Sequence, residues 1–268
     1  MLGTGNDELA RLALQHRLWS DAAVAAWRRA GLAPGQRALD VGCGPGHASF
    51  DLAQLVTPSG AVVAIDESSP VVEFANQQAR HRGMPQLTAR TGDVQRLADV
   101  LRDQPPFDLA YARWVLCFVP DPEAVVRGVA RALRPGGRLV VHDYFNYASM
   151  TMAPRRQSHD RAVAATVKSW QARGGDPDVG QRLPALFAQH GLRLDELQVH
   201  TRVARGSDSM FAWVDSWWRT FAPKLVGMGL LAQRDCDDLV RDLEAVRGGA
   251  GFVQCPPVYE FVATRVAG

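Results

Sequence analysis

The chain has 268 residues, of which 47% are hydrophobic and 22% charged, and its formal net charge is +2. This composition is typical of a folded globular protein, and so small a charge excess gives no reason to expect a nucleic acid as partner. Four well-separated cysteines without metal-binding spacing argue against a zinc site or a disulfide framework, and we expect no metal.

The N-terminal segment has the pattern of helices. Between residues 6 and 30 apolar side chains recur at helical spacing, and Ser20 or Asp21 offers an N-cap within the pattern. The pattern therefore predicts two successive helices, which end before the turn Pro34-Gly35.

A buried strand, a glycine turn and the start of a helix follow. Residues 38–41 form an apolar run broken by one acid, which is typical of a fully buried strand in a parallel sheet. The turn Gly42-Cys43-Gly44-Pro45-Gly46 comes next, and the apolar residues over 48–55 fit the helix after it. Glycines at such a turn permit positive φ angles and let a ligand approach the main chain closely. We therefore expect the turn to contact a ligand.

The second predicted strand, residues 61–66, ends in an acid. Asp66 lies about 20 residues after the last glycine, where a carboxylate can accept hydrogen bonds from both hydroxyls of a ribose. A dinucleotide site would need Gly-x-Gly-x-x-Gly, but after Gly42 and Gly44 the third glycine position holds His47. The ligand is therefore expected to carry a ribose without being a dinucleotide.

Strands and helices alternate through the next part of the chain. We expect helices over 69–82, 95–101 and 121–133, and strands over 86–91, 107–112 and 137–143. A further helix and strand are expected over 184–191 and 193–204, and a last strand over 251–266. Short connections between alternating elements imply right-handed crossovers and a parallel sheet. The predicted fold class is α/β.

Several motifs resemble those of one family. The pattern Asp40-x-Gly42-x-Gly44-x-Gly46 resembles the first motif of class I S-adenosylmethionine (SAM)-dependent methyltransferases. Thr91-Gly92-Asp93-Val94 is similar to the acidic turn after the third strand of this family, and residues 107–116 and 132–143 resemble its fourth strand, proline-glycine turn and fifth strand. The likeness covers residues 10–145 and points to small-molecule enzymes such as the ubiquinone and menaquinone methyltransferases.

The resemblance implies a Rossmann-like sheet of seven strands, mostly parallel with the last strand antiparallel, and SAM as cofactor with S-adenosylhomocysteine as product. It implies that Asp40 orders the glycine loop and the methionine end of SAM, that Asp66 binds the ribose, and that Asp93 accepts from the adenine amino group. The expected cofactor site comprises Trp19, Asp40, Gly42, Cys43, Gly44, Gly46, Asp66, Glu67, Gly92, Asp93, Val94 and Arg113.

The resemblance also divides the chain into parts. We expect residues 1–35 as an N-terminal helical lid over the cofactor, 36–143 as the cofactor-binding core, 179–205 as a core helix and strand, and 251–268 as the last core strand. Two stretches exceed what the sheet needs, 144–178 and 206–250, and both have a helical pattern. Ligands of open α/β sheets lie beyond the carboxyl ends of the strands. We therefore expect both insertions to cap the substrate.

A methyltransferase needs a general base only where its acceptor arrives protonated. His142 and Asp143, at the end of the fifth strand, and His159, in the first insertion, are the candidate catalytic residues, although each also fits a purely structural role. The second insertion holds an aromatic-rich stripe within residues 211–221. This stripe fits either core packing or a wall for a planar acceptor.

We expect an O-methyltransferase of secondary metabolism that acts on a small molecule. The alternatives are C- or N-methylation of a small molecule, a protein of this fold that binds SAM without transferring methyl, and an NAD(P) oxidoreductase. The sequence Ala112-Arg113-Trp114-Val115 stands where nucleic-acid amino-methylating families carry an Asn/Asp-Pro-Pro-Tyr-like turn. Its difference from that turn argues against a nucleic-acid substrate.

The start of the chain and its apolar runs bear on the cellular compartment of the protein. Its first seven residues contain no basic stretch followed by an apolar core, and no run of about 18 apolar residues occurs. We therefore expect a cytoplasmic protein, a monomer or a homodimer, without a membrane partner.

Overall fold

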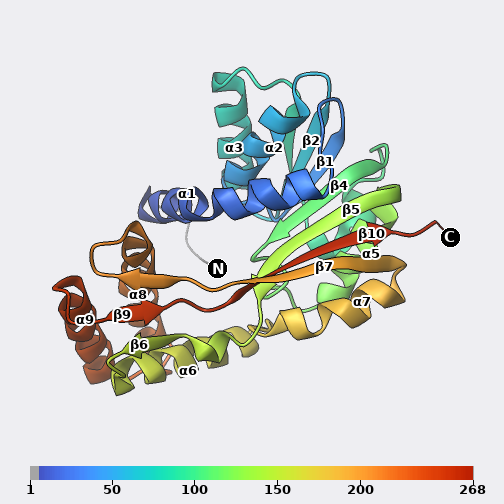
Figure 1. Ribbon diagram of the computed structural model, residues 1–268. Helices are drawn as coiled ribbons and strands as arrows, with labels where there is room; N and C mark the ends of the chain where they lie inside the picture. The colour runs from blue at the N-terminus through green and yellow to red at the C-terminus, as the bar shows by residue number, and fades with distance from the viewer. Residues whose placement is uncertain (1–5, 268) are drawn as a thin grey trace.

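The computed structural model describes residues 6–267 and contains a seven-stranded sheet with helices on both faces (Figure 1). The strands of this sheet are β1 (Arg37–Val41), β2 (Ala61–Asp66), β3 (Leu87–Thr91), β4 (Phe107–Arg113), β5 (Leu133–Tyr144), β7 (Leu192–His200) and β10 (Val258–Arg265). Their order is β3-β2-β1-β4-β5-β10-β7. The first five strands, β1, β2, β3, β4 and β5, are all parallel to one another. β10 runs antiparallel to both of its neighbours. The predicted Rossmann-like sheet with an antiparallel last strand is thereby confirmed.

Two hydrophobic cores lie on opposite faces of the sheet. The α-helices are α1 (Asn6–Arg29), α2 (His47–Val56), α3 (Ser69–His81), α4 (Leu97–Val100), α5 (Pro122–Ala132), α6 (Gln157–Gln171), α7 (Leu183–Gln189), α8 (Ser209–Gly227) and α9 (Gln233–Arg247). Successive side chains of a strand point to opposite faces. Ala38 and Tyr111 accordingly pack with α1, α2 and α3, whereas Leu39 and Ala112 pack in the core that contains α5 and α7.

The N-terminal segment is one helix, so the predicted break at Ser20 or Asp21 was wrong. Neither side chain caps a helix: the Ser20 hydroxyl bonds to the Arg17 carbonyl, and Asp21 pairs with Arg202. The buried face of α1 continues past both residues, and Trp27 is fully buried in it. Packing of this continuous apolar face on the sheet outweighs the capping tendency of two polar residues.

A second, three-stranded sheet was not predicted. Its strands are β6 (Thr151–Ala153), β8 (Val203–Arg205) and β9 (Phe252–Gln254), in the order β6-β9-β8. The strand predicted over 251–266 is divided, because Pro256 and Pro257 lack the N–H groups that would continue the ladder between β9 and β10. Because β6 belongs to this sheet, the insertion at 144–178 contributes a strand as well as a helix.

The cap consists of α6, α8, α9 and the small sheet. The three helices pack against one another, and in Figure 1 they gather beside one end of the large sheet. α1 contacts both α2 and α8, so it runs from the helix after the glycine turn to the cap. Within the described residues no helix has the length and apolarity needed to cross a bilayer. Residues 1–5, part of the predicted lid, and Gly268, the end of the predicted last core strand, lie outside the described residues.

Candidate active site

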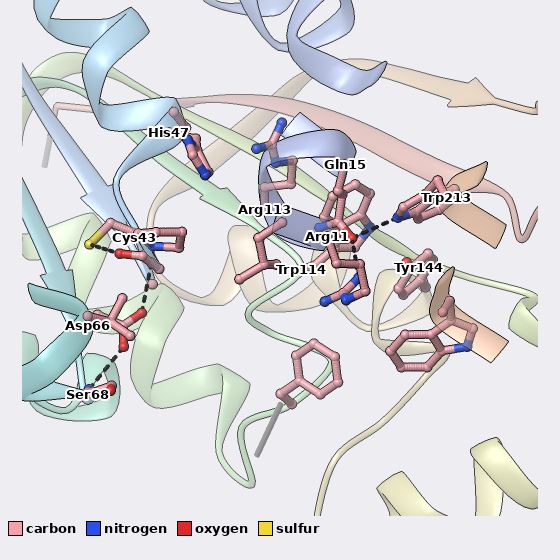
Figure 2. Close-up of a pocket in the computed structure, with 18 of the residues that line it drawn as sticks. Arg11, Gln15, Cys43, His47, Asp66, Ser68, Arg113, Trp114, Tyr144 and Trp213 are labelled. Atoms are coloured by element: carbon pink, nitrogen blue, oxygen red, sulfur yellow. Dashed lines mark hydrogen bonds between the residues drawn. The ribbon is translucent and has the colours of Figure 1, made fainter. Parts of the chain in front are cut away.

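A cavity of about 410 Å³ is lined by α1, the carboxyl ends of β1, β2, β4 and β5, and the cap (Figure 2). We call the part beside the glycine turn the cofactor end; it is formed by Asp40, Gly42, Cys43, Gly44, Pro45, His47, Asp66, Glu67 and Ser68. The opposite part is the aromatic end, formed by Trp114, Phe118, Tyr144, Tyr147, Met150, Trp170, Trp213, Val214, Trp217 and Phe221, together with Arg11 and Arg173. Figure 2 shows Arg113 and Trp114 between the two.

The glycine turn takes a conformation that other residues rarely adopt. Gly42, Gly44 and Gly46 have φ angles of 68°, 53° and 83°. A Cβ atom at Gly42 would lie 2.4 Å from a methyl carbon of Val115, whereas a Cβ atom at Gly44 would meet no protein atom within 4 Å. Gly44 therefore faces the open space of the cavity, as expected for a main chain that a ligand approaches closely.

Two acids lie beside the glycine turn, and one of them, Asp66, bonds to it. Buried Asp40 accepts a hydrogen bond of 2.6 Å from the Ser49 hydroxyl, and burial raises the pKa of Asp40 to about 6. Asp66 accepts from the amides of Gly44 at 2.9 Å and Ser68 at 3.0 Å, one on each carboxylate oxygen (Figure 2). Each of these oxygens has a second lone pair. Asp66 thus supports the turn and still has acceptor capacity for two hydroxyl groups.

The predicted adenine turn lies outside the cavity lining. Asp93 is exposed, and its carboxylate accepts from the Gln95 amide at 2.8 Å, which caps a short 3-10 turn. The Gly92 amide donates to the Asp66 carbonyl at 2.9 Å, so this turn directly adjoins the end of β2. Gly92, Asp93 and Val94 stay predictions as adenine contacts.

The lid helix contributes to the cavity through residues other than Trp19. Trp19 is 1% exposed, packs edge-on against Trp114 and Trp213, and does not line the cavity. One turn earlier, Gln15 does line it. Its side-chain oxygen accepts from Trp213 Nε1 at 2.9 Å and from Arg11 Nη1 at 3.1 Å. The prediction named Trp19, whereas the structure places Gln15 of the same helix at the cavity.

A chain of polar contacts joins α1, α2 and β4 beside the glycine turn. His16 binds Arg113 Nη2 through Nδ1 and Asp51 Oδ2 through Nε2, both at 3.0 Å. A guanidinium can only donate. His16 Nδ1 is therefore the acceptor, and Nε2 carries the proton donated to Asp51. His47 stacks on His16, and its pKa is lowered to about 4 by burial and by the nearby His16 and Arg113, so His47 is neutral near pH 7.

Asp143, a predicted catalytic residue, is fully buried behind the cavity and does not line it. Its carboxylate accepts from the amides of Leu116 at 3.0 Å, Cys117 at 3.2 Å and Tyr144 at 2.9 Å. Burial raises its pKa to about 6, against the opposing effect of these hydrogen bonds. Asp143 holds the loop after β4 in place.

His142 also lies outside the cavity lining, in a cluster on β5, β10 and β7. Glu260 accepts from His142 and from His200, each at 2.9 Å, and pairs with Arg29 of α1. Burial lowers the pKa of His142. The sequence indicated no metal, yet this cluster places three possible ligand atoms within 4.8 Å of one another. Because Arg29 already balances the Glu260 carboxylate, the arrangement fits an ion-pair network that fastens α1 to the sheet.

His159 lies in the core of the cap. It is fully buried, packs edge-on against Trp218, and has no hydrogen-bond partner for either ring nitrogen among the described residues. Burial lowers its pKa to about 4. The structure therefore brings none of the three candidate bases to the cavity.

The predicted stripe of α8 divides between the protein core and the cavity lining. Phe211 and Trp218 are core residues, whereas Val214 and Phe221 line the cavity. The prediction missed most of the aromatic end, which also draws on β5, the loop after β4 and α6. These residues lie in three segments separated in sequence and share no local pattern: Phe118, then Tyr144, Tyr147 and Met150, then Trp170.

Comparison with known proteins decides the family. Residues 32–189 match a family described as a methyltransferase domain, which is more than half of the chain. The chain belongs to the class I SAM-dependent methyltransferases. SAM is the cofactor of this family.

Curated relatives act on different small molecules. A nocamycin O-methyltransferase from Saccharothrix syringae is 40% identical over 106 residues, 40% of this chain and 37% of the relative. A 2-phytyl-1,4-naphtoquinone methyltransferase from Synechococcus elongatus is 36% identical over 130 residues, 48% of this chain and 53% of the relative. The chain spans about half or less of the length of the curated relatives it matches.

Solved structures show the same fold at low sequence identity. The YcgJ protein of Bacillus subtilis has a TM-score of 0.61 at 17% identity, covering 90% of this chain and 96% of its own. A geranyl diphosphate C-methyltransferase from Streptomyces coelicolor has a TM-score of 0.56 at 15% identity, covering 94% and 77%. These likenesses extend over the cap as well as the sheet.

Proposed function

We propose that this protein transfers a methyl group from SAM to an oxygen atom of a small organic acceptor in secondary metabolism, within the cytoplasm. One observation carries the proposal: a single cavity runs from the glycine turn to an aromatic enclosure built by the cap. Such a cavity places a cofactor and a mostly apolar acceptor in contact. The similarity to a nocamycin O-methyltransferase supports oxygen as the acceptor atom and secondary metabolism as the setting.

The cofactor end fits SAM. Gly44 leaves space at the turn, and Asp66 keeps one free lone pair on each oxygen for the ribose hydroxyls. Cys43 and Glu67 also line this end, and Arg113 closes it toward the aromatic end. When bound, SAM supplies an electrophilic methyl group on a positively charged sulfur.

The protein orients the acceptor and excludes water from the site. Methyl transfer is an in-line displacement, so its rate depends on holding the acceptor atom near attack distance in a site without water. α1 covers the cavity through Leu12 and Gln15, and Gln15 is fixed by its bond to Trp213 of the cap. The walls at the aromatic end leave the acceptor few orientations. No candidate base is needed at the cavity if the acceptor arrives deprotonated.

The test is a product search. The protein is incubated with methyl-labelled SAM and a library of aromatic and polyketide-like acceptors, and the labelled product is identified by mass spectrometry and NMR beside S-adenosylhomocysteine. We expect a labelled O-methyl group. A labelled carbon or nitrogen would replace the O-assignment by one of its alternatives.

The same protein sample distinguishes the remaining alternatives. Calorimetry should show binding of S-adenosylhomocysteine and none of NADH. Binding of S-adenosylhomocysteine without any methylated product across the library would favour a SAM-binding protein that does not transfer methyl. Tight binding of NADH alone would overturn the proposal.

A further inference from the structure

We propose that the acceptor is a planar aromatic molecule with an acidic group, and that Arg173 receives this group at the aromatic end of the cavity. The inference rests on the proposed function and adds the chemical class of the acceptor. It follows from two independent properties of the aromatic end, its shape and its charge.

Part of the wall of the aromatic end consists of nearly parallel rings. The ring of Trp114 lies within 25° of parallel to the rings of both Tyr144 and Trp213, with centroids 6.0 and 6.1 Å away. Trp217 and Phe221 form a second stacked pair, with centroids 4.5 Å apart and an angle of 20°. Aligned rings offer extended flat faces, which gain most contact with a planar ligand. A planar aromatic acceptor fits these walls best.

The charge of the aromatic end is positive. Its ionisable side chains within the described part of the chain are Arg11, Arg173, Tyr144 and Tyr147. Burial raises the pKa of both tyrosines, so they stay neutral near pH 7. The carboxylates that line the cavity all belong to the cofactor end. A cationic amine would meet no opposite charge at the aromatic end, whereas an anion would meet a guanidinium.

Arg173 is the guanidinium whose charge no carboxylate of the described residues balances. Arg11 is buried and forms two hydrogen bonds with Glu8, of 2.6 and 2.9 Å, so its charge is already balanced. Arg173 is exposed, follows the end of α6, and has no salt bridge with any side chain of the described residues. Its recorded side-chain contact is with the sulfur of Met228, at 4.0 Å. A carboxylate on the acceptor can therefore bind Arg173 without displacing another anion.

Three naphthalene derivatives of one shape and different charge test the proposal. 2-Naphthoate, 2-naphthamide and 2-naphthylmethylammonium are titrated into the full chain saturated with S-adenosylhomocysteine, and binding is followed by tryptophan fluorescence. We expect 2-naphthoate to bind about tenfold more tightly than the amide, or ~1.4 kcal/mol, and the ammonium compound to bind most weakly.

The variant Arg173→Gln should reduce the preference for 2-naphthoate over 2-naphthamide to less than about twofold and leave amide binding unchanged, because only the ion pair is lost. Arg234→Gln is the matched control: Arg234 is an 80% exposed residue of α9 that does not line the cavity. This control should keep the full preference.

The proposal is overturned if Arg173→Gln keeps the preference, if the amide binds as tightly as the naphthoate, or if none of the three compounds binds. Calorimetry with S-adenosylhomocysteine on the same samples separates this failure from failure of the proposed function. If S-adenosylhomocysteine binds but 2-naphthoate is not preferred, the proposed acceptor class is refuted and the proposed function stands. Loss of cofactor binding in the unmodified chain refutes the proposed function.

Discussion

Replacing Gly44 with alanine tests whether the glycine turn approaches the cofactor, and Gly31 provides a matched control. Both residues have left-handed φ angles, 53° at Gly44 and 80° at Gly31. A Cβ atom would meet no protein atom within 4 Å at either position. Only Gly44 lines the cavity. The two substitutions therefore impose the same backbone strain and differ in what the added methyl group faces.

The strain of an alanine in the left-handed region is roughly 1–2 kcal/mol. In a protein of this size each kcal/mol lowers the melting temperature by about 2–4 °C, so both variants should melt about 2–8 °C below the unmodified protein. The Cβ atom at Gly44 additionally occupies space that the cofactor needs. We expect Gly44→Ala to weaken binding of S-adenosylhomocysteine at least about tenfold, a loss of ~1.4 kcal/mol, and Gly31→Ala to leave it unchanged.

Isothermal titration calorimetry with S-adenosylhomocysteine, alongside thermal unfolding of each variant, provides both quantities. Equal cofactor affinity of Gly44→Ala and the unmodified protein would refute the close approach of this turn to the cofactor. Equal loss of affinity in both variants would show that backbone strain alone, rather than the methyl group in the cavity, disturbs the site.

Three further predictions concern buried or charged groups. Asp66→Ala should cost about 1–3 kcal/mol of S-adenosylhomocysteine affinity by calorimetry, since the ribose loses a charged acceptor; unchanged affinity would mean that Asp66 does not bind the ribose. The pKa of Asp40 rises from 3.8 to about 6 on folding, so its contribution to stability is present below pH 3.8 and is lost as the pH rises to about 6. Urea unfolding should therefore show Asp40→Asn gaining stability relative to the unmodified protein over this interval and no further gain above it; a constant difference would contradict the shift. His159→Leu should stabilise the fold by about 1 kcal/mol in urea unfolding, because it removes two buried nitrogens without partners, and a large destabilisation would point to a partner that the described residues do not show.

The sheet and the place of the glycine turn at its edge were predictable because their signals are local. A buried strand, a glycine turn and a terminal acid occupy adjacent positions in sequence, and the alternation of elements determines the parallel sheet. The α1 break was predicted wrongly because Ser20 and Asp21 have capping tendencies that tertiary packing outweighs. A local pattern does not show which residue of a helix faces a cavity, which is why Trp19 was selected although Gln15 lines the cavity.

The candidate bases show what a local pattern leaves open about a site. His142 and Asp143 occupy the end of a strand that does reach the cavity, through Tyr144. Successive side chains of a strand point to opposite faces, so Asp143 points away from the face of Tyr144. His142 shares the face of Tyr144 but is engaged by Glu260, which comes from a distant segment. The aromatic end depends on the same long-range assembly, so its composition became visible only in the folded chain.

The position of Gln15 and His16 on α1 has a consequence for turnover. These neighbours on one helix bond in different directions, Gln15 to Trp213 of the cap and His16 to Arg113 and Asp51 beside the glycine turn. A displacement of α1 that opens the cofactor end must also break the bond to the cap. Under the proposed function, exchange of spent cofactor and release of methylated product would then share one opening motion of this helix.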